Sequence, residues 1–363
     1  GRIAGILPRP AEGRVKPRED TRLVDLFGKR LLPGFIDIHT HGAAGVDFNH
    51  ATAGEVRGVT RFFSSCGVTS YLPTVLSDSE ETMAAQLATI TDPPLLADCP
   101  EILGIHLEGP FLCASHKGAQ PERFLRECDP AVFDKLQEAA NGKIRLMTLA
   151  PELAGAESLT RHAVAHGTRV SLGHSAASYE QAMAAIDAGA TSATHIINAM
   201  KLLHMHDPAI LTAALESDIY AEMICDGFHL HPPIVRFLLK VKGRERMIAV
   251  TDSIMAAGLP DGDYVLGVHD ITVKGGDAKL SRSGVRAGST LTMIAALRNI
   301  MSFTGLDLER SSRLLSENPA RMLGIFDSTG SITVGKRADL VVLDQDMRVG
   351  MTIARGAITY AAG

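Results

Sequence analysis

Tryptophan is absent from this chain of 363 residues, and aromatic residues make up only 5% of it. Recognition of a carbohydrate by stacking on an indole ring is therefore excluded. The five cysteines are odd in number and form no CxxC pair, which argues against a disulfide framework and for a reducing compartment. We accordingly expect a cytoplasmic protein.

An excess of either charge and a long apolar run are also missing. The net charge is −5, from 36 basic and 41 acidic residues, which leaves no basic footprint for nucleic acid. No apolar run reaches the roughly 20 residues that a membrane span requires. The first residues, GRIAGILPRP, lack the apolar core of a signal peptide. They also lack an initiator methionine, so we expect the natural N-terminus to be missing. These features predict a globular protein that partners neither nucleic acid nor membrane.

What the chain does contain is a regular alternation of short apolar runs with amphipathic segments. Such alternation predicts parallel strands joined by helical crossovers. Eight units between residues 33 and 326 predict a (β/α)8 barrel of the TIM type. An open doubly wound sheet is the alternative, but no GxGxxG or P-loop motif follows the first run. The eight runs are GFIDIH, VTSYLPTV, ILGIHLEG, IRLMTLAPE, TRVSLGHS, SATHIINA, YAEMICDG and MIAVTDS.

The sequence pattern at both ends of the chain differs from the strand–helix alternation of the predicted barrel. Residues 1–32 and 327–363 contain short β-like runs broken by glycine, proline and charged residues. We predict that they form one small β-sandwich domain, beside a hydrolase barrel domain spanning 33–326. The glycine-rich segment 262–287 predicts a hairpin-bearing excursion after the eighth strand. Local signals support the helices: Ser178 and Gln181 have the spacing of a capping box, and the predicted C-cap glycines are Gly67, Gly167 and Gly189.

Polar residues stand where these predicted strands end. In PGFIDIHTHG, His39 and His41 are two residues apart and so share one face of a strand. Barrel active sites are built at the C-terminal ends of the strands, and six of the eight runs end in histidine, glutamate or aspartate. The predicted site residues are His39, His41, Glu108, His174, His195, His229 and Asp252.

This set of side chains suits a divalent metal ion. Imidazole and carboxylate ligands together accept zinc and iron, and manganese and cobalt remain open. A divalent ion with an open coordination position lowers the pKa of bound water toward 7. Asp252 is placed to move a proton, and His229 to polarise a carbonyl group. The residues therefore predict metal-assisted hydrolysis of an amide-like bond.

The motifs also resemble a known family. The opening PGFIDIHTHG, the late TD and the closing VGKRADLVVLD resemble the amidohydrolase superfamily. The finer motifs HLEGPFL, KGAQ, GHS, THIINAM, DGFH and TDS are similar to those of the N-acetylglucosamine-6-phosphate deacetylase family within it. This resemblance covers nearly the whole chain from about residue 22. It implies removal of an acetyl group from an amino-sugar phosphate, by a homodimer that holds one or two divalent ions, most often zinc or iron.

Roles for individual residues follow from the resemblance. It implies that Glu108, His174 and His195 bind the metal ion common to active members. Retention of His39 and His41 implies the two-metal type, in which the glutamate bridges. Asp252 is implied as the catalytic acid and base, and His229 as the group that polarises the acetyl carbonyl. The implied substrate-binding residues are Gln120, Asn198, Ala199, His206, Asp226, Gly227, Ala287, Gly288 and Ser289.

One position departs from the family pattern. Relatives commonly carry an arginine after NAM that clamps the 6-phosphate, whereas NAMKLLHMHDPAI places His206 there. A guanidinium group suits phosphate better than one imidazole. Either His206 binds the phosphate, with His204 beside it, or the substrate differs. Alternatives are N-acetylgalactosamine-6-phosphate, an unphosphorylated N-acetyl sugar, another amide, or a catalytically inactive binding module.

Overall fold

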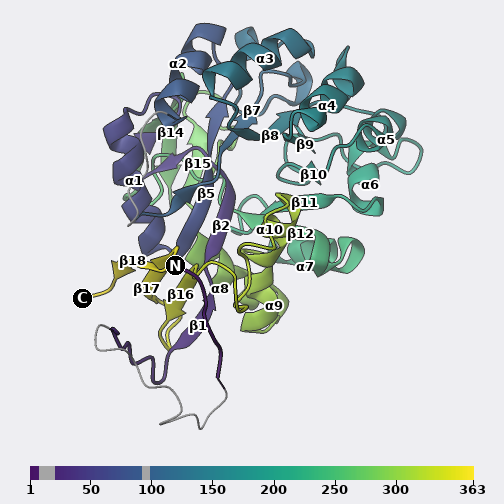
Figure 1. Cartoon of the computed structure of the whole chain (residues 1–363). Helices are drawn as coiled ribbons and strands as arrows, with labels where there is room; N and C mark the ends of the chain where they lie inside the picture. The colour runs from purple at the N-terminus through teal and green to yellow at the C-terminus, as the bar shows by residue number, and fades with distance from the viewer. Residues whose placement is uncertain (8–20, 92–98) are drawn as a thin grey trace.

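The structure is a computed structural model, and it describes residues 1–7, 21–91 and 99–363. Figure 1 shows strands at the centre of the molecule, helices around them, and both chain ends at the same side. No helix among the described residues is long and apolar enough to cross a membrane.

Eight parallel strands form the barrel, in the order in which they occur along the chain. A parallel bridge between Thr40 and Ser253, just beyond the eighth strand, closes the circle. Almost every residue of these strands is buried, as expected for a parallel sheet that is covered on both faces. Each of the eight predicted runs overlaps one of these strands, so the predicted (β/α)8 barrel is confirmed. The strands are β2 (Phe35–Thr40), β5 (Val68–Leu76), β7 (Ile105–Glu108), β8 (Ile144–Leu149), β9 (Arg169–Leu172), β10 (Ser192–Ala193), β11 (Tyr220–Ile224) and β12 (Met247–Val250).

Helices surround the barrel (Figure 1). The predicted capping box is present, because Ser178 Oγ accepts from the Gln181 backbone while the Gln181 side chain accepts from the Ser178 backbone. The three predicted C-cap glycines all have positive φ, which glycine adopts without steric cost. The helices are α1 (Ala53–Ser65), α2 (Glu80–Thr91), α3 (Pro130–Ala139), α4 (Ala156–Ala165), α5 (Tyr179–Asp187), α6 (Ala209–Glu216), α7 (Pro232–Lys242), α8 (Met293–Thr304), α9 (Leu308–Arg313) and α10 (Glu317–Met322).

The two ends of the chain meet in a four-stranded antiparallel sheet, as predicted. Its order is β1 (Arg30–Pro33), β16 (Leu340–Leu343), β17 (Val349–Ala354) and β18 (Ala357–Ala361). The sheet is hydrogen-bonded to α1, because Thr352 Oγ1 donates to the Ser64 carbonyl over 2.7 Å. Among the described residues, this sheet forms the small domain. Residues 8–20 of its N-terminal part lie outside them, and the boundaries 1–32 and 327–363 stay a prediction.

The excursion predicted after the eighth strand is a three-stranded antiparallel meander. Its strands are β13 (Gly262–Leu266), β14 (His269–Lys274) and β15 (Asp277–Leu280). Leu266 and Ile271 pack in one apolar cluster with Leu76, at the end of β5. The meander therefore lies beside the C-terminal ends of the barrel strands. Short segments complete the list: β3 (Gly42–Ala43), β4 (Val46–Asp47), β6 (Glu101–Ile102) and the 3-10 turns Ala114–His116, Glu122–Phe124 and Arg244–Arg246.

Candidate active site

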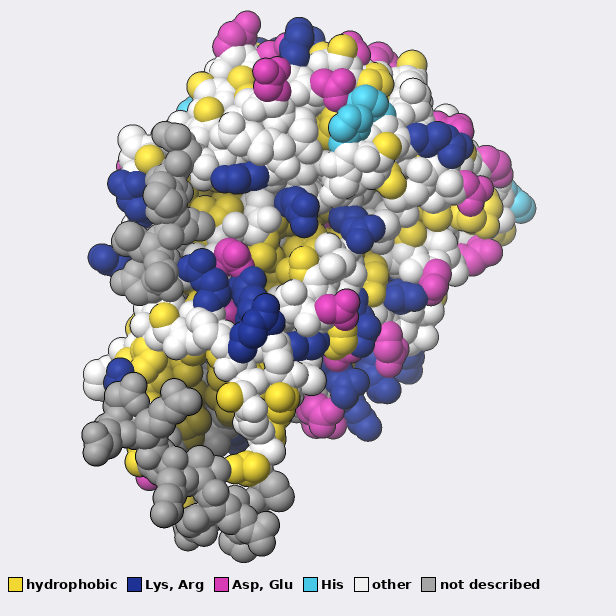
Figure 2. All heavy atoms as spheres, viewed as in Figure 1, with side chains coloured by type: hydrophobic (Ala, Val, Ile, Leu, Met, Phe, Trp, Pro, Cys, Tyr) yellow, Lys and Arg dark blue, Asp and Glu magenta, His cyan; other side chains and the backbone are white. Residues whose placement is uncertain are grey.

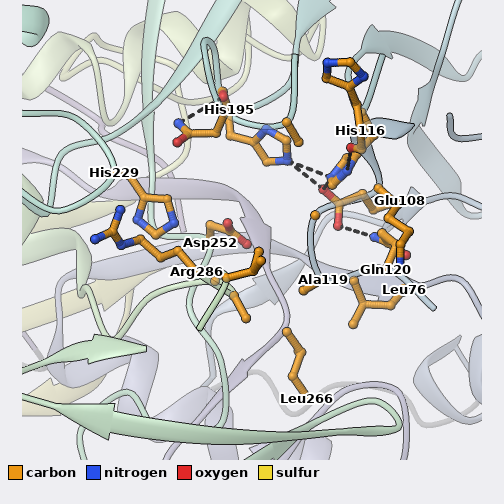
Figure 3. A pocket seen from close by; sticks show the side chains of 18 of the residues that line it. Leu76, Glu108, His116, Ala119, Gln120, His195, His229, Asp252, Leu266 and Arg286 are labelled. Carbon is orange, nitrogen blue, oxygen red and sulfur yellow. Dashed lines mark hydrogen bonds and ion pairs between the residues drawn. The ribbon is translucent and has the colours of Figure 1, made fainter. Parts of the chain in front are cut away.

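A cavity of about 550 Å³ opens at the C-terminal ends of the strands. Strand-end residues form its floor, the loop 114–120 forms one wall, and residues 285–288 beyond the meander form another. Figure 3 shows Glu108, His195, His229 and Asp252 directed into this space from different strand ends. These predicted residues therefore lie together at the face where barrel enzymes build their active sites.

Glu108, the last residue of β7, is the centre of the cluster. Its Oε1 atom lies 3.2 Å from His174 Nε2 and 3.1 Å from His195 Nε2. Its Oε2 atom lies 3.3 Å from His41 Nε2 and accepts a hydrogen bond of 2.9 Å from Gln120 Nε2. One carboxylate thus faces histidines from three other strands, so it is placed to bridge two ions.

The potential ligands form two groups around that carboxylate. Within each group, the ligand atoms all lie within 4.8 Å of one another, and every residue is buried. His41 Nε2 and Asp252 Oδ1 are 3.1 Å apart, and His39 Nε2 is 3.5 Å from the same oxygen. The groups are Glu108, His174 and His195, and His39, His41 and Asp252. The sequence placed the same residues together.

Several of these residues have an unusual backbone conformation. His174, His195 and Asp252 have φ values of 49°, 28° and 48°, a left-handed region that costs energy for residues other than glycine. Each stands two residues beyond the end of a strand, where the positive φ turns the chain sharply. Such strain concentrates at functional sites, and here it belongs to residues that face the cavity.

Electrostatics make the cavity floor a favourable place for a cation. Burial opposes a charge on His39, but the neighbouring carboxylates, Glu108 first, outweigh it and raise the pKa of His39. Burial likewise opposes a charge on His41, and its bonds to Asp252 and Glu108 raise the pKa of His41 to about 9. For Asp252, burial raises the pKa, but the charge on His39 and the hydrogen bond from His41 outweigh burial and lower the pKa to about 2. The ionised carboxylates favour any positive charge that enters.

The residues fit a divalent ion on geometric grounds as well. His39 Nε2 is fully buried and has no hydrogen-bond partner among the described residues. His174 Nε2 and His195 Nε2 lie only 3.0 Å apart and face the same Glu108 oxygen. Lone pairs so close repel one another unless a cation or proton lies between them. The nitrogen and oxygen donors suit both zinc and iron. They therefore fit a divalent ion but do not distinguish between these two metals.

Glu222 supports the cluster and was missed in the sequence. Its Oε2 lies 2.9 Å from His39 Nδ1 and accepts from the His195 backbone N–H over 3.2 Å. The Nδ1 atom of His39 therefore donates, which leaves Nε2 to bind an ion. A carboxylate that orients a histidine ligand in this way is common in metal sites. The position of Glu222 as an acidic residue within the apolar run YAEMICDG could have indicated a functional role.

Replacement of Glu222 by glutamine is expected to weaken metal binding about 10- to 100-fold. The variant removes the negative charge behind His39 while keeping the size of the side chain. Metal occupancy at buffered free zinc concentrations measures the effect, with Glu216→Gln, an exposed carboxylate at the end of α6, as the control. Equal affinities in the two variants would contradict this role for Glu222.

His229 is held by a carboxylate of its own. Asp226 Oδ2 lies 2.7 Å from His229 Nδ1, and Asp226 Oδ1 accepts from the His229 backbone N–H over 2.8 Å. In this structure Asp226 orients His229, and its predicted role in binding substrate stays a prediction. Because Nδ1 donates to Asp226, Nε2 is the nitrogen left for the cavity, which His229 lines.

The other predicted substrate residues divide into two sets. Those that line the cavity are Gln120, Asn198, Ala199, Ala287 and Gly288. Gly227, which follows Asp226, and Ser289, which follows Gly288, do not line it. Ser289 Oγ donates to the Thr251 carbonyl over 2.6 Å. His206 is exposed, on the loop after Met200, and also lies outside the lining. The roles of all these residues stay predictions.

Two cationic side chains in the lining were not predicted. Lys117 comes from the loop 114–120, and Arg286 directly precedes the predicted stretch Ala287 to Ser289. His116, in the same loop as Lys117, accepts through its backbone carbonyl from His174 Nδ1 at 3.0 Å. The KGAQ motif and the stretch RAGS carried a signal for both cations, but only folding brings them to one cavity.

Comparison with known proteins agrees with this geometry. Residues 30–359 match the sequence model of the Amidohydrolase family. The chain is 38% identical over 335 residues to N-acetylglucosamine-6-phosphate deacetylase of Bacillus subtilis (strain 168), covering 91% of this chain and 84% of the relative. It is 36% identical over 365 residues to N-acetylgalactosamine-6-phosphate deacetylase of Escherichia coli O157:H7, covering 99% and 92%. The crystal structure of N-acetylglucosamine-6-phosphate deacetylase from Pasteurella multocida superposes with a TM-score of 0.91 at 33% identity, covering 99% and 93%.

Proposed function

The chain belongs to the amidohydrolase family, and we propose that it hydrolyses N-acetylglucosamine-6-phosphate to glucosamine-6-phosphate and acetate. The observation that carries the proposal is the cluster around Glu108, with His229 and Asp252 in the same cavity. Relatives at 35 to 38% identity that bear this activity as their name support the substrate. The second candidate substrate is N-acetylgalactosamine-6-phosphate, favoured by the E. coli relative.

Glu108, His174 and His195 would hold one divalent ion, and His39 and His41 a second one. When bound, such an ion activates water and polarises a carbonyl group. Asp252 is ionised at neutral pH, since its pKa is lowered to about 2 by the histidines around it, against the effect of burial. It therefore accepts a proton from the attacking water. It later gives that proton to the amide nitrogen, which leaves as the amine of the sugar.

His229 acts on the acetyl oxygen. When both of its ring nitrogens carry hydrogen, Nδ1 donates to Asp226 and Nε2 donates to the carbonyl oxygen. The Asp226 carboxylate, 2.7 Å from Nδ1, fixes the orientation of the ring. Negative charge develops on that oxygen as the tetrahedral intermediate forms, so a donor fixed in advance lowers the barrier.

The phosphate needs a cation, and Arg286 is oriented to supply one. Its Nε and Nη2 atoms donate to the two oxygens of Asp277 over 2.7 and 3.0 Å. Among the described residues, Nη1 has no hydrogen bond, so one edge of the guanidinium stays open. Lys279 Nζ also lies 2.9 Å from Asp277, which leaves these three residues with a net positive charge. Figure 3 shows Arg286 reaching to the His229 side of the cavity, opposite Gln120.

Acetate release from phosphorylated and unphosphorylated N-acetyl sugars tests both the substrate and Arg286. We expect kcat/KM to be at least 100-fold higher for N-acetylglucosamine-6-phosphate than for N-acetylglucosamine, about 2.7 kcal/mol of transition-state binding. Arg286→Met should remove most of this preference and leave hydrolysis of the free sugar unchanged within a few-fold. Arg282→Met, an exposed arginine of the same segment, is the matched control.

The outcomes separate the two claims. If the wild type cleaves neither glucosamine nor galactosamine derivatives, the proposed activity is wrong. If it prefers the phosphorylated sugar and Arg286→Met keeps that preference, the activity stands and the role of Arg286 is wrong. A selective loss in His206→Ala would then assign the phosphate to the loop that the sequence indicated.

A homodimer fits the surface around His206, and we propose that state. Leu202, Leu203 and Met205 on this loop are 56%, 57% and 83% exposed. Apolar side chains gathered on one loop favour coverage by another protein surface. In a dimer, a second subunit would cover the loop and bring His206 of one chain toward the cavity of the other.

A further inference from the structure

A third group of metal-ligating side chains lies outside the cavity, on the surface formed by α3 and α4. Asp134 belongs to α3, His162 belongs to α4, and His166 is the C-cap residue of α4. Their ligand atoms all lie within 4.8 Å of one another. Figure 2 shows histidine side chains side by side on this surface, in the region of α3 and α4. We propose that Asp134, His162 and His166 form a peripheral site for a divalent transition metal ion, zinc in the first place.

The ring of His166 is fixed by a hydrogen bond to the backbone of its own helix. Its Nδ1 atom lies 2.8 Å from the backbone carbonyl oxygen of His162. A carbonyl only accepts, so Nδ1 carries the hydrogen, and Nε2 keeps its lone pair. Metal-binding histidines characteristically donate their other ring N–H to a carbonyl or carboxylate. The spacing of four residues also places His162 and His166 on one helix face, with ring centroids 4.4 Å apart.

The other two ligands already face each other. His162 Nε2 and Asp134 Oδ1 are 2.6 Å apart, and the His162 ring packs edge-on against Phe133 at 6.0 Å. In this contact one proton lies between the nitrogen and the carboxylate. An entering ion takes the place of that proton, and the neutral ring then carries its one hydrogen on Nδ1, so both atoms become ligands without rebuilding the helices.

The donor set selects the class of ion. Two imidazoles and one carboxylate favour zinc, nickel or copper, whereas calcium and magnesium require mainly oxygen ligands. Zinc ligands at about 2.0–2.2 Å in a tetrahedron stand about 3.3 to 3.6 Å from one another. Rotation of side chains brings atoms that are at most 4.8 Å apart to that spacing, and these three side chains are exposed or half-buried. Water would occupy the fourth position.

Such an ion would join two neighbouring helices that are separated in sequence by β8. It would be exposed to solvent, unlike the buried cluster around Glu108, so it would exchange more readily. An ion that binds only the folded protein stabilises it in proportion to its concentration. The inferred effect is thus a gain in stability when zinc exceeds the need of the catalytic centre, and it holds whatever the enzyme's substrate is.

The test uses the holoenzyme with its cavity ions already bound and counted by mass spectrometry. On equilibration with micromolar free zinc, the wild type should take up one further zinc per chain. Its Tm should rise by about 2 °C or more, and magnesium should give no rise. His166→Ala and Asp134→Asn should lose both the additional zinc and the Tm shift while keeping their activity. His231→Gln, an exposed histidine at the start of α7, should behave as the wild type.

The same measurements can overturn the proposal. It is wrong if the loaded wild type takes up no further zinc. It is equally wrong if His166→Ala, with unchanged activity and unchanged Tm in the absence of zinc, takes up as much as the wild type. A His231→Gln variant that alone loses the ion would place the additional zinc elsewhere.

Discussion

Asp252→Asn is expected to lower kcat/KM for the acetylated sugar by about 1,000-fold or more. Asparagine keeps the shape of the side chain but cannot accept the proton of the attacking water. The loss corresponds to about 4 kcal/mol of barrier. The local structure should survive, because the Asp252 backbone N–H still donates to the His39 carbonyl over 2.9 Å.

Metal content must be measured on the same samples, since Asp252 Oδ1 also lies within 3.1 Å of His41 Nε2. If Asp252 transfers the proton, the variant keeps its ion on Glu108, His174 and His195 and still loses the rate. A rate that falls only in parallel with metal content would assign Asp252 to metal binding alone. Asp263→Asn, an exposed carboxylate on β13, is the control and should retain full activity.

Glu108→Gln should abolish both metal binding and hydrolysis. The carboxylate lies within 3.3 Å of a nitrogen of each of four histidines, so its charge is shared by both ligand groups. An amide is neutral, and its NH2 group would point a donor at nitrogens that must bind the ion. We expect less than a tenth of the wild-type metal content and a rate at least 1,000-fold lower, about 4 kcal/mol in barrier.

Elemental analysis after gel filtration and acetate release measure the two effects. Glu127→Gln changes an exposed carboxylate whose side chain accepts from the Ala154 backbone, and it should keep metal and activity. Restoration of the Glu108→Gln rate by excess zinc would show that the residue contributes affinity only. Wild-type metal content in this variant would contradict the bridging role.

Much of the site could be predicted because its residues stand at the ends of strands that the sequence pattern reveals. Alternation of apolar runs and helices fixes the barrel, and the barrel rule brings the last residues of all strands to one face. The prediction therefore placed His39, His41 and Glu108 close together, as they are in the structure. Each of them stands in a short motif whose secondary structure could be assigned from local sequence alone.

The residues that escaped prediction act across long distances in the chain. Glu222 touches His39 although 183 positions separate them, and no pattern in either segment points to the other. Arg286 reaches the cavity because the meander packs beside the strand ends, which depends on tertiary contacts such as that of Leu266 with the end of β5. The exposure of His206 is likewise a property of loop conformation, which residue identity alone does not determine.

The sheet that joins the chain ends has a consequence for synthesis on the ribosome. Strand β1 leaves the ribosome before any part of the barrel, yet its partner β16 follows all eight barrel strands: Arg30 pairs with Leu343 and Leu32 with Val341. Until then, the backbone groups of β1 have no strand to pair with. A nascent chain must keep this segment unpaired while the whole barrel is translated, and a product shortened before Leu340 would carry an open strand edge of the kind that promotes aggregation.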